Sequence, residues 1–194
     1  MNSLFKVITL AVTIASAPLV FASDNTQIFE QSLGKSFNED MMFQDLSKSF
    51  PSSDGTLTYA YLPTKKLGIP FKSHSAYLTP TSKLVAIIEA TKIEDDAPTC
   101  ESTLRYFSDE LADKQFGNFK TLDTLKKMGY SLGGAEGDSP IQVRYDPKMN
   151  YSLQYGCIPS SSEAGKYAFI VSFSANDLKE VAKKEYDQLV ATKG

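Results

Sequence analysis

The segment Gly129-Tyr130-Ser131-Leu132-Gly133 carries the G-x-S-x-G spacing of a nucleophilic serine. In α/β-hydrolases this spacing presents the serine on a strained turn between a strand and a helix. Here the preceding residues Leu122–Met128 have the apolar spacing of a helix, and glycine-rich sequence follows. The one histidine, His74, precedes the serine, whereas that fold places its histidine last. We therefore interpret the motif as the glycine end of a helix that runs into a loop.

A second serine, Ser139, completes the His, Asp, Ser chain order of chymotrypsin-like proteases, with His74 and the acidic pair Asp95-Asp96 before it. In those enzymes a glycine follows the nucleophile and shapes the oxyanion hole. Here Pro140 follows, and proline has no N–H group to donate. A small secreted serine hydrolase that uses Ser131 or Ser139 with His74 is therefore retained only as an alternative function.

Metal, cofactor and nucleic-acid sites find little support in the composition. The acidic run Glu94-Asp95-Asp96 lacks the alternating ligands and the glycine turn of a calcium loop. Two cysteines and one histidine cannot complete a zinc site. The chain has neither a P-loop motif nor the G-x-G-x-x-G motif of dinucleotide-binding proteins. The chain has 20 Lys and Arg against 23 Asp and Glu, without a basic cluster. We predict no metal, no cofactor and no nucleic-acid partner.

The two cysteines, Cys100 and Cys157, are expected to form one structural disulfide. An even cysteine count in an exported chain favours pairing, and the wide spacing excludes a CxxC redox motif. Two free thiols or one reactive cysteine are the alternatives that this reasoning leaves open.

The N-terminus indicates export. Lys6 precedes an apolar run from Val7 to Ala17, and Val20-Phe21-Ala22 has the small residues that a signal peptidase accepts before Ser23. The run is too short to span a bilayer. We predict a signal peptide at residues 1–22, a single α+β domain at residues 23–194, a periplasmic or secreted location, and no integral membrane segment after cleavage.

Several elements must position any functional residues. Apolar residues at four-residue spacing from Phe29 to Phe50 predict two short amphipathic helices. Alternation or apolar runs bounded by turn residues predict six strands. These strands are expected at residues 56–61, 73–78, 83–91, 141–145, 151–157 and 167–173.

Two longer helices are also expected. Asp96 and Pro98 predict a helix start, and Leu104, Phe107 and Leu111 form its apolar stripe. The last helix is expected to begin near Ser174. Together these elements predict an α+β fold: an antiparallel sheet of about six strands, with a long central helix and a C-terminal helix packed on one side and short N-terminal helices.

The glycine-rich loop Leu132–Pro140 is longer than its connection requires, and loops of this kind often carry recognition. We predict Tyr130, Glu136 and Asp138 as partner contacts, because an aromatic anchor beside acidic residues suits a binding patch.

Because every catalytic pattern fails in its context, the sequence favours a non-enzymatic exported protein that binds another protein, such as a toxin or a hydrolase. Inhibitors of cell-wall-degrading hydrolases and periplasmic immunity proteins belong to this class. A structural or accessory envelope protein is a further alternative.

Overall fold

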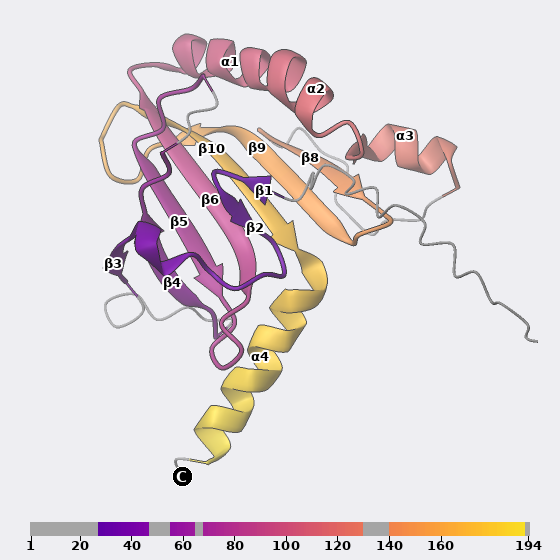
Figure 1. Ribbon diagram of the computed structural model, residues 1–194. Helices are drawn as coiled ribbons and strands as arrows, with labels where there is room; N and C mark the ends of the chain where they lie inside the picture. Colours follow the sequence, from indigo (N-terminus) through magenta and orange to yellow (C-terminus); the bar gives the residue numbers. More distant parts are fainter. Residues whose placement is uncertain (1–26, 47–54, 65–67, 130–139, 193–194) are drawn as a thin grey trace, which may run out of the picture.

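The computed structural model describes residues 27–46, 55–64, 68–129 and 140–192. Its largest feature is an eight-stranded antiparallel sheet with the order β3-β4-β5-β6-β10-β9-β8-β7 (Figure 1). The strands are β3 (Met42–Asp45), β4 (Leu57–Tyr61), β5 (Ser73–Leu78), β6 (Val85–Glu94), β7 (Lys120–Thr121), β8 (Ile141–Asp146), β9 (Tyr151–Pro159) and β10 (Tyr167–Ala175). A separate small hairpin is formed by β1 (Gln27–Ile28) and β2 (Gln31–Ser32).

Most of the helical residues follow β6 or β10 in the chain. Residues after β6 form α1 (Ala97–Tyr106), the π-helical segment η2 (Phe107–Ala112) and α2 (Asp113–Gln115). The other segments are the 3-10 helix η1 (Glu39–Met41), α3 (Leu122–Lys127) and α4 (Asn176–Ala191). Asp96 caps α1 as expected, because its carboxylate accepts a 2.8 Å hydrogen bond from the Thr99 N–H.

Burial alternates along the central strands and divides the sheet into two faces. On β6 the side chains of Ile88 and Ala90 are fully buried, whereas Ile87 and Glu89 are only half-buried. Phe107 packs on Phe169 of β10 with ring centroids 5.6 Å apart. We call this the covered face, because α1, η2 and the β1–β2 hairpin lie on it; the opposite side is the open face.

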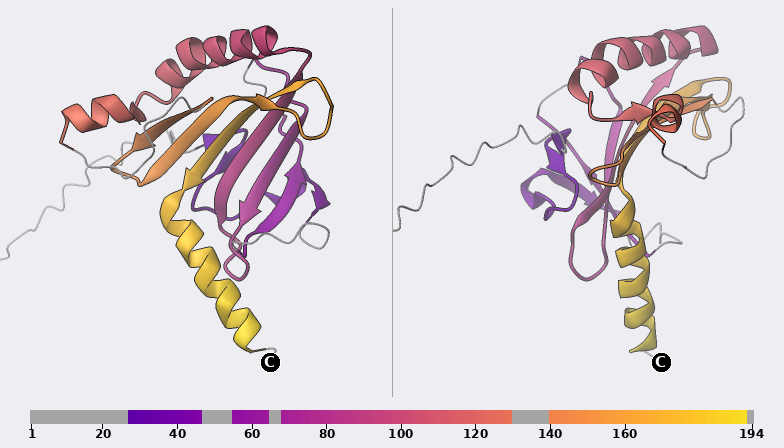
Figure 2. Two further views of the ribbon diagram at one scale, coloured as in Figure 1. Left: turned by 180° about the vertical axis from the view of Figure 1, so that it is seen from behind. Right: turned by 90° about the vertical axis from the view of Figure 1, so that its right-hand side faces the viewer.

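The two views in Figure 2 make the difference between the faces visible. Seen from behind, the strands are not crossed by any helix of the part of the chain that the structure describes. In the side view, the β1–β2 hairpin lies on the side of the sheet opposite to the face that is seen from behind. Among the described residues, the aromatic core therefore lies on the covered face.

The α+β class is confirmed, and so are the hairpins β5–β6 and β8–β9. The expected number of about six strands is wrong, because the sheet has eight. The two additional strands, β3 and β7, are the outermost ones. The sequence of β3 lies inside an expected helix, and β7 has only two residues, too few to show a periodic pattern.

The expected N-terminal helices are absent from residues 27–46, where the structure has β1, β2, η1 and β3. The residues that suggested them, Phe29, Leu33 and Phe37, are nevertheless all buried. Phe29 and Gly34 both have positive φ angles, of 50° and 74°. Tight turns at these two residues therefore bring the chain back to the core every four residues, which reproduces the spacing of a helix.

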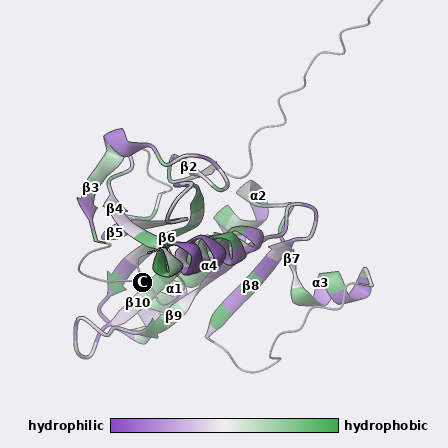
Figure 3. Ribbon diagram, turned by 90° about the horizontal axis from the view of Figure 1, so that it is seen from below, coloured by the Kyte–Doolittle hydropathy of each residue, from purple (hydrophilic) through white to green (hydrophobic). Residues whose placement is uncertain are grey.

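The C-terminal helix α4 does not lie flat on the sheet. It continues from the end of β10 and extends beyond the sheet, with its C-terminal end far from the strands (Figure 1). Gly55 contacts it closely: a Cβ atom at Gly55 would lie 2.4 Å from Tyr186 Cβ. Ala182 is the one fully buried residue of α4, and Figure 3 shows hydrophilic and hydrophobic residues alternating along the helix.

Candidate functional site

The open face is the side of β5, β6, β10, β9 and β8 that lies opposite the aromatic core; most of its side chains are half-buried, Ser73 is exposed, and Gly156, Ser152 and Ser174 are buried. Paired residues of neighbouring strands point to the same face, so the register assigns its side chains directly. The central row is Ser75, Glu89, Ser172, Gln154 and Val143. The flanking rows are Ser73, Thr91, Ile170, Gly156 and Ile141 on one side, and Tyr77, Ile87, Ser174, Ser152 and Tyr145 on the other.

These three rows are poor in charge, because Glu89 is their one charged residue. The remaining side chains are apolar residues, tyrosines, serines, a threonine and a glutamine. A sheet face that meets only water normally carries many charged side chains, whereas the centre of a protein interface is depleted of them. In its low charge, though not in its many serines, the open face resembles the centre of a protein interface.

Glu89 lies in the middle of this face, between Ser75 of β5 and Ser172 of β10. Burial raises the pKa of its carboxyl above the usual value. Among the described residues, no lysine or arginine forms an ion pair with it. The carboxylate is thus partly desolvated, without a compensating cation from the part of the chain that the structure describes.

Large apolar side chains are also exposed at the β3–β4 edge of the sheet. Phe43 is 70% exposed and Leu62 is 61% exposed. The register between β3 and β4 shifts between Met42 and Gln44, which makes Phe43 the extra residue of a bulge. Bulges redirect side chains at sheet edges, and here the phenyl ring is directed to solvent.

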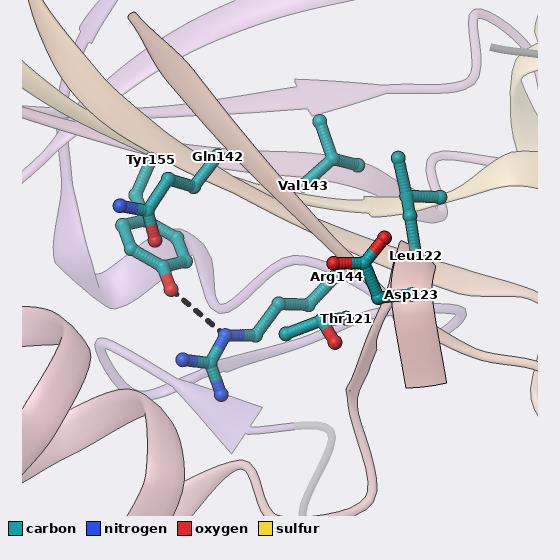
Figure 4. A pocket seen from close by; sticks show the side chains of 7 residues that line it. All are labelled: Thr121, Leu122, Asp123, Gln142, Val143, Arg144 and Tyr155. Atoms are coloured by element: carbon teal, nitrogen blue, oxygen red, sulfur yellow. Dashed lines mark hydrogen bonds between the residues drawn. The ribbon is translucent and has the colours of Figure 1, made fainter. Parts of the chain in front are cut away.

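A pocket of about 270 Å³ lies where α3 meets β8 and β9 (Figure 4). Its lining residues are Thr121, Leu122, Asp123, Gln142, Val143, Arg144 and Tyr155. Arg144 Nε donates to the Tyr155 hydroxyl at 2.8 Å, and its Nη2 donates to Ser108 Oγ at 3.3 Å. Its Nη1 donates to the Asp113 carboxylate.

This arginine network joins two strands to the long helical segment. The Arg144 side chain is 10% exposed, whereas its partner Asp113 is 61% exposed. All three guanidinium nitrogens have partners within the protein, and Figure 4 shows the guanidinium group extending away from Leu122 and Asp123. We therefore assign Arg144 a structural role beside the pocket.

His74 lies in an aromatic cluster on the covered face. Its ring centroid is 4.9 Å from that of Phe29 and 5.8 Å from those of Tyr61 and Phe71. Burial lowers the pKa of His74 to about 4, so the ring is neutral at pH 7. These contacts are those of a core side chain.

The acidic residues that were considered as partners of His74 have other contacts. Asp96 caps α1, and Asp95 forms an ion pair with Lys166 at 3.5 Å. His74 pairs with Ala90, well before the end of β6, whereas Asp95 follows that end. The structure does not bring His74 and these carboxylates together.

The remaining residue of the acidic run, Glu94, is also engaged. Its carboxylate accepts a hydrogen bond from Lys92 Nζ at 2.6 Å and another from the Thr103 hydroxyl. Within the ranges that the structure describes, no group of three His, Cys, Asp or Glu side chains is placed to hold a metal ion. No helix in those ranges combines the length and apolar character needed to cross a membrane.

Cys100 and Cys157 lie at disulfide distance, with their sulfur atoms 2.06 Å apart and their Cα atoms 6.0 Å apart. This arrangement is compatible with the expected bond between α1 and β9. The other site predictions, Tyr130, Glu136 and Asp138, lie outside the described residues, as do Ser131 and Ser139. Gly129, which begins the G-x-S-x-G motif, follows α3 with a φ angle of +86°, so a helix and not a strand precedes the serine.

Sequence reasoning missed the open face. The signal was the single glutamate, Glu89, that follows the apolar residues Val85–Ile88 of β6. Comparison of the chain with family models, curated proteins and solved structures finds no match.

Proposed function

We propose that this protein is an exported, non-enzymatic binding protein that recognises another protein through the open face of its sheet. It belongs functionally with inhibitors or immunity proteins, whose partners are hydrolases or toxins. The observation that carries the proposal is the near absence of charge from a broad face that no described helix covers.

Two further features support recognition by this side of the molecule. Its central row combines serine, glutamine and valine side chains, which provide hydrogen-bonding groups next to apolar contact area. The sheet beneath is packed against the aromatic core of the covered face. A rigid, preorganised surface loses little conformational freedom when a partner binds.

The test is site-specific photo-crosslinking in the exported fraction of the native organism. A photoreactive phenylalanine analogue is placed at Ile170 or Gln154 on the open face, and at Glu180 on α4 as the control. We expect one protein to be linked from both open-face positions and not from position 180. No specific product from either open-face position would contradict the proposal.

A second pair of variants separates the open face from the glycine-rich loop. Ile170→Lys introduces a charge into the proposed interface, and we expect it to weaken partner binding at least about 10-fold without loss of the fold. Deletion of residues 133–137 tests the loop contacts Tyr130, Glu136 and Asp138. If only the deletion abolishes binding, the loop and not the sheet carries the recognition.

A further inference from the structure

We infer that the partner of the open face places a cationic side chain, from lysine or arginine, directly on the Glu89 carboxylate. This inference rests on the proposed function, because it specifies the chemistry of the partner that binds there. It follows from the position of one charge in an otherwise uncharged surface.

The geometry places Glu89 at the centre of the face. In the sheet order β5, β6 and β10 are consecutive, and Glu89 stands in the middle row of that region. Its neighbours across the strands are Ser75 and Ser172, and those along its own strand are Ile87 and Thr91. None of these four side chains carries a charge that could balance the carboxylate.

A partner that covers this face must remove the remaining water from the carboxylate. Removing an ionised carboxylate from water without supplying a cation carries a large free-energy penalty. Glu89 is already half-buried in the free protein, and this burial raises the pKa of its carboxyl. An apolar or acidic contact at this point would add to the penalty, whereas a lysine or arginine would replace the lost hydration.

The hydroxyl groups of Ser75 and Ser172 fit the same arrangement. They flank Glu89 on both sides and can accept hydrogen bonds from the N–H groups of a cation that already contacts the carboxylate. The chain as a whole has a net charge of −3, which favours approach of a basic partner over an acidic one.

The same reasoning argues against a second copy of this chain as the occupant. Two open faces related by a twofold axis through the centre would bring two Glu89 carboxylates into one interface. Such a pair would add like-charge repulsion to the penalty of desolvation. The surface is therefore suited to a different protein.

The experiment uses the partner identified by crosslinking from position 170 and measures its dissociation constant with purified full-length variants. We expect Glu89→Gln to weaken binding at least about 30-fold, mainly through faster dissociation, and Glu89→Lys to weaken it further. Glu180→Gln, an exposed glutamate on α4, is the matched control and should leave the affinity unchanged. Melting temperatures of all variants establish that the fold is intact.

A charge exchange then identifies the pairing residue. The crosslinked region of the partner is searched for the lysine or arginine whose change to glutamate restores binding to Glu89→Lys. Restoration supports the inference. If Glu89→Gln binds as tightly as the wild type, the inference is wrong while the proposed function stands; if no partner is crosslinked at all, both are wrong.

Discussion

Arg144 of β8 and Tyr155 of β9 are joined by a side-chain hydrogen bond beneath the π-helical segment. The Arg144 Nε donates to the Tyr155 hydroxyl at 2.8 Å, and the guanidinium carbon lies 5.7 Å from the Tyr155 ring centroid. Because the same guanidinium also reaches Ser108 and Asp113, one side chain links the sheet to both η2 and α2.

Replacing Arg144 by methionine should therefore destabilise the protein by about 2 to 3 kcal/mol, because buried polar groups lose their donor. Urea unfolding measures the change. Asp113→Asn is the control, and it should cost less than about 1 kcal/mol, because that carboxylate is largely exposed. Equal losses for the two variants would contradict the structural role of Arg144.

Two tyrosines should respond in opposite directions to loss of their hydroxyl groups. The Tyr61 hydroxyl is buried and has no hydrogen-bond partner among the described residues. Tyr61→Phe should stabilise the protein by about 1 kcal/mol, whereas Tyr155→Phe should destabilise it by a similar amount or more. Thermal or urea unfolding of the two variants side by side checks the signs.

His74 should make the protein less stable in acid. Its folded-state pKa of about 4 lies below its ordinary value of 6.5. The unfolded chain therefore binds the proton first, and stability that is fully present above pH 6.5 is lost as the pH falls towards 4. The loss should be about 2 kcal/mol after allowance for solvent that reaches the ring.

Urea unfolding of the wild type and of His74→Phe between pH 4 and pH 7 isolates this contribution. The variant should lose the part of the pH dependence that belongs to His74. An ordinary histidine pKa, measured by NMR in the folded protein, would overturn the prediction.

Glu89→Gln should stabilise the free protein at pH 7. The folded-state pKa of Glu89 is raised by burial, so the carboxylate destabilises the folded state progressively as the pH rises above the unfolded value. We expect a gain at pH 7 that shrinks as the pH approaches 4. A variant that is more stable and also binds its partner less tightly would mark Glu89 as a residue kept for binding.

The exported protein should begin at Ser23 and contain the Cys100–Cys157 bond. Its intact mass should therefore be that of residues 23–194, lighter by two hydrogen atoms than the reduced form. Cys100→Ser should reduce stability by about 4 kcal/mol in the chain-entropy model of a disulfide. Thiols that react in the native exported protein would contradict the bond.

The hairpins could be predicted from the sequence because their signals are local. The strand of β8, the turn after Asp146 and the strand of β9 are contiguous, and each has the right residue types. The structure of the N-terminal region could not be predicted from the sequence, because Phe29 adopts a positive φ angle that is unusual for a bulky residue. Its ring is held in that position by Phe71 and His74, which are distant in sequence.

The candidate surface was harder to predict than the fold. Ser75, Glu89 and Ser172 belong to three different strands, and only the register places them in one row. The strand order that joins β6 to β10 is itself a long-range pairing that no local pattern encodes. By contrast, the interpretation of Gly129 as a helix end needed only the neighbouring residues, and it is confirmed.

The sheet order has a consequence for how the chain folds. The strands β3 to β6 form one meander and the strands β8 to β10 another, and the two meet only where β6 pairs with β10. Within each meander the paired strands are near in sequence. Pairing of β6 with β10, in contrast, requires closure of the loop formed by residues 95–166. The pairing of β6 with β10 should be the slow step of folding, because long-range contacts are the main determinant of folding rate in small domains. Cys100 and Cys157 both lie within that segment. If their disulfide forms before β6 pairs with β10, it shortens the loop that must be closed. This should favour folding over aggregation through the two unpaired edges of β6 and β10.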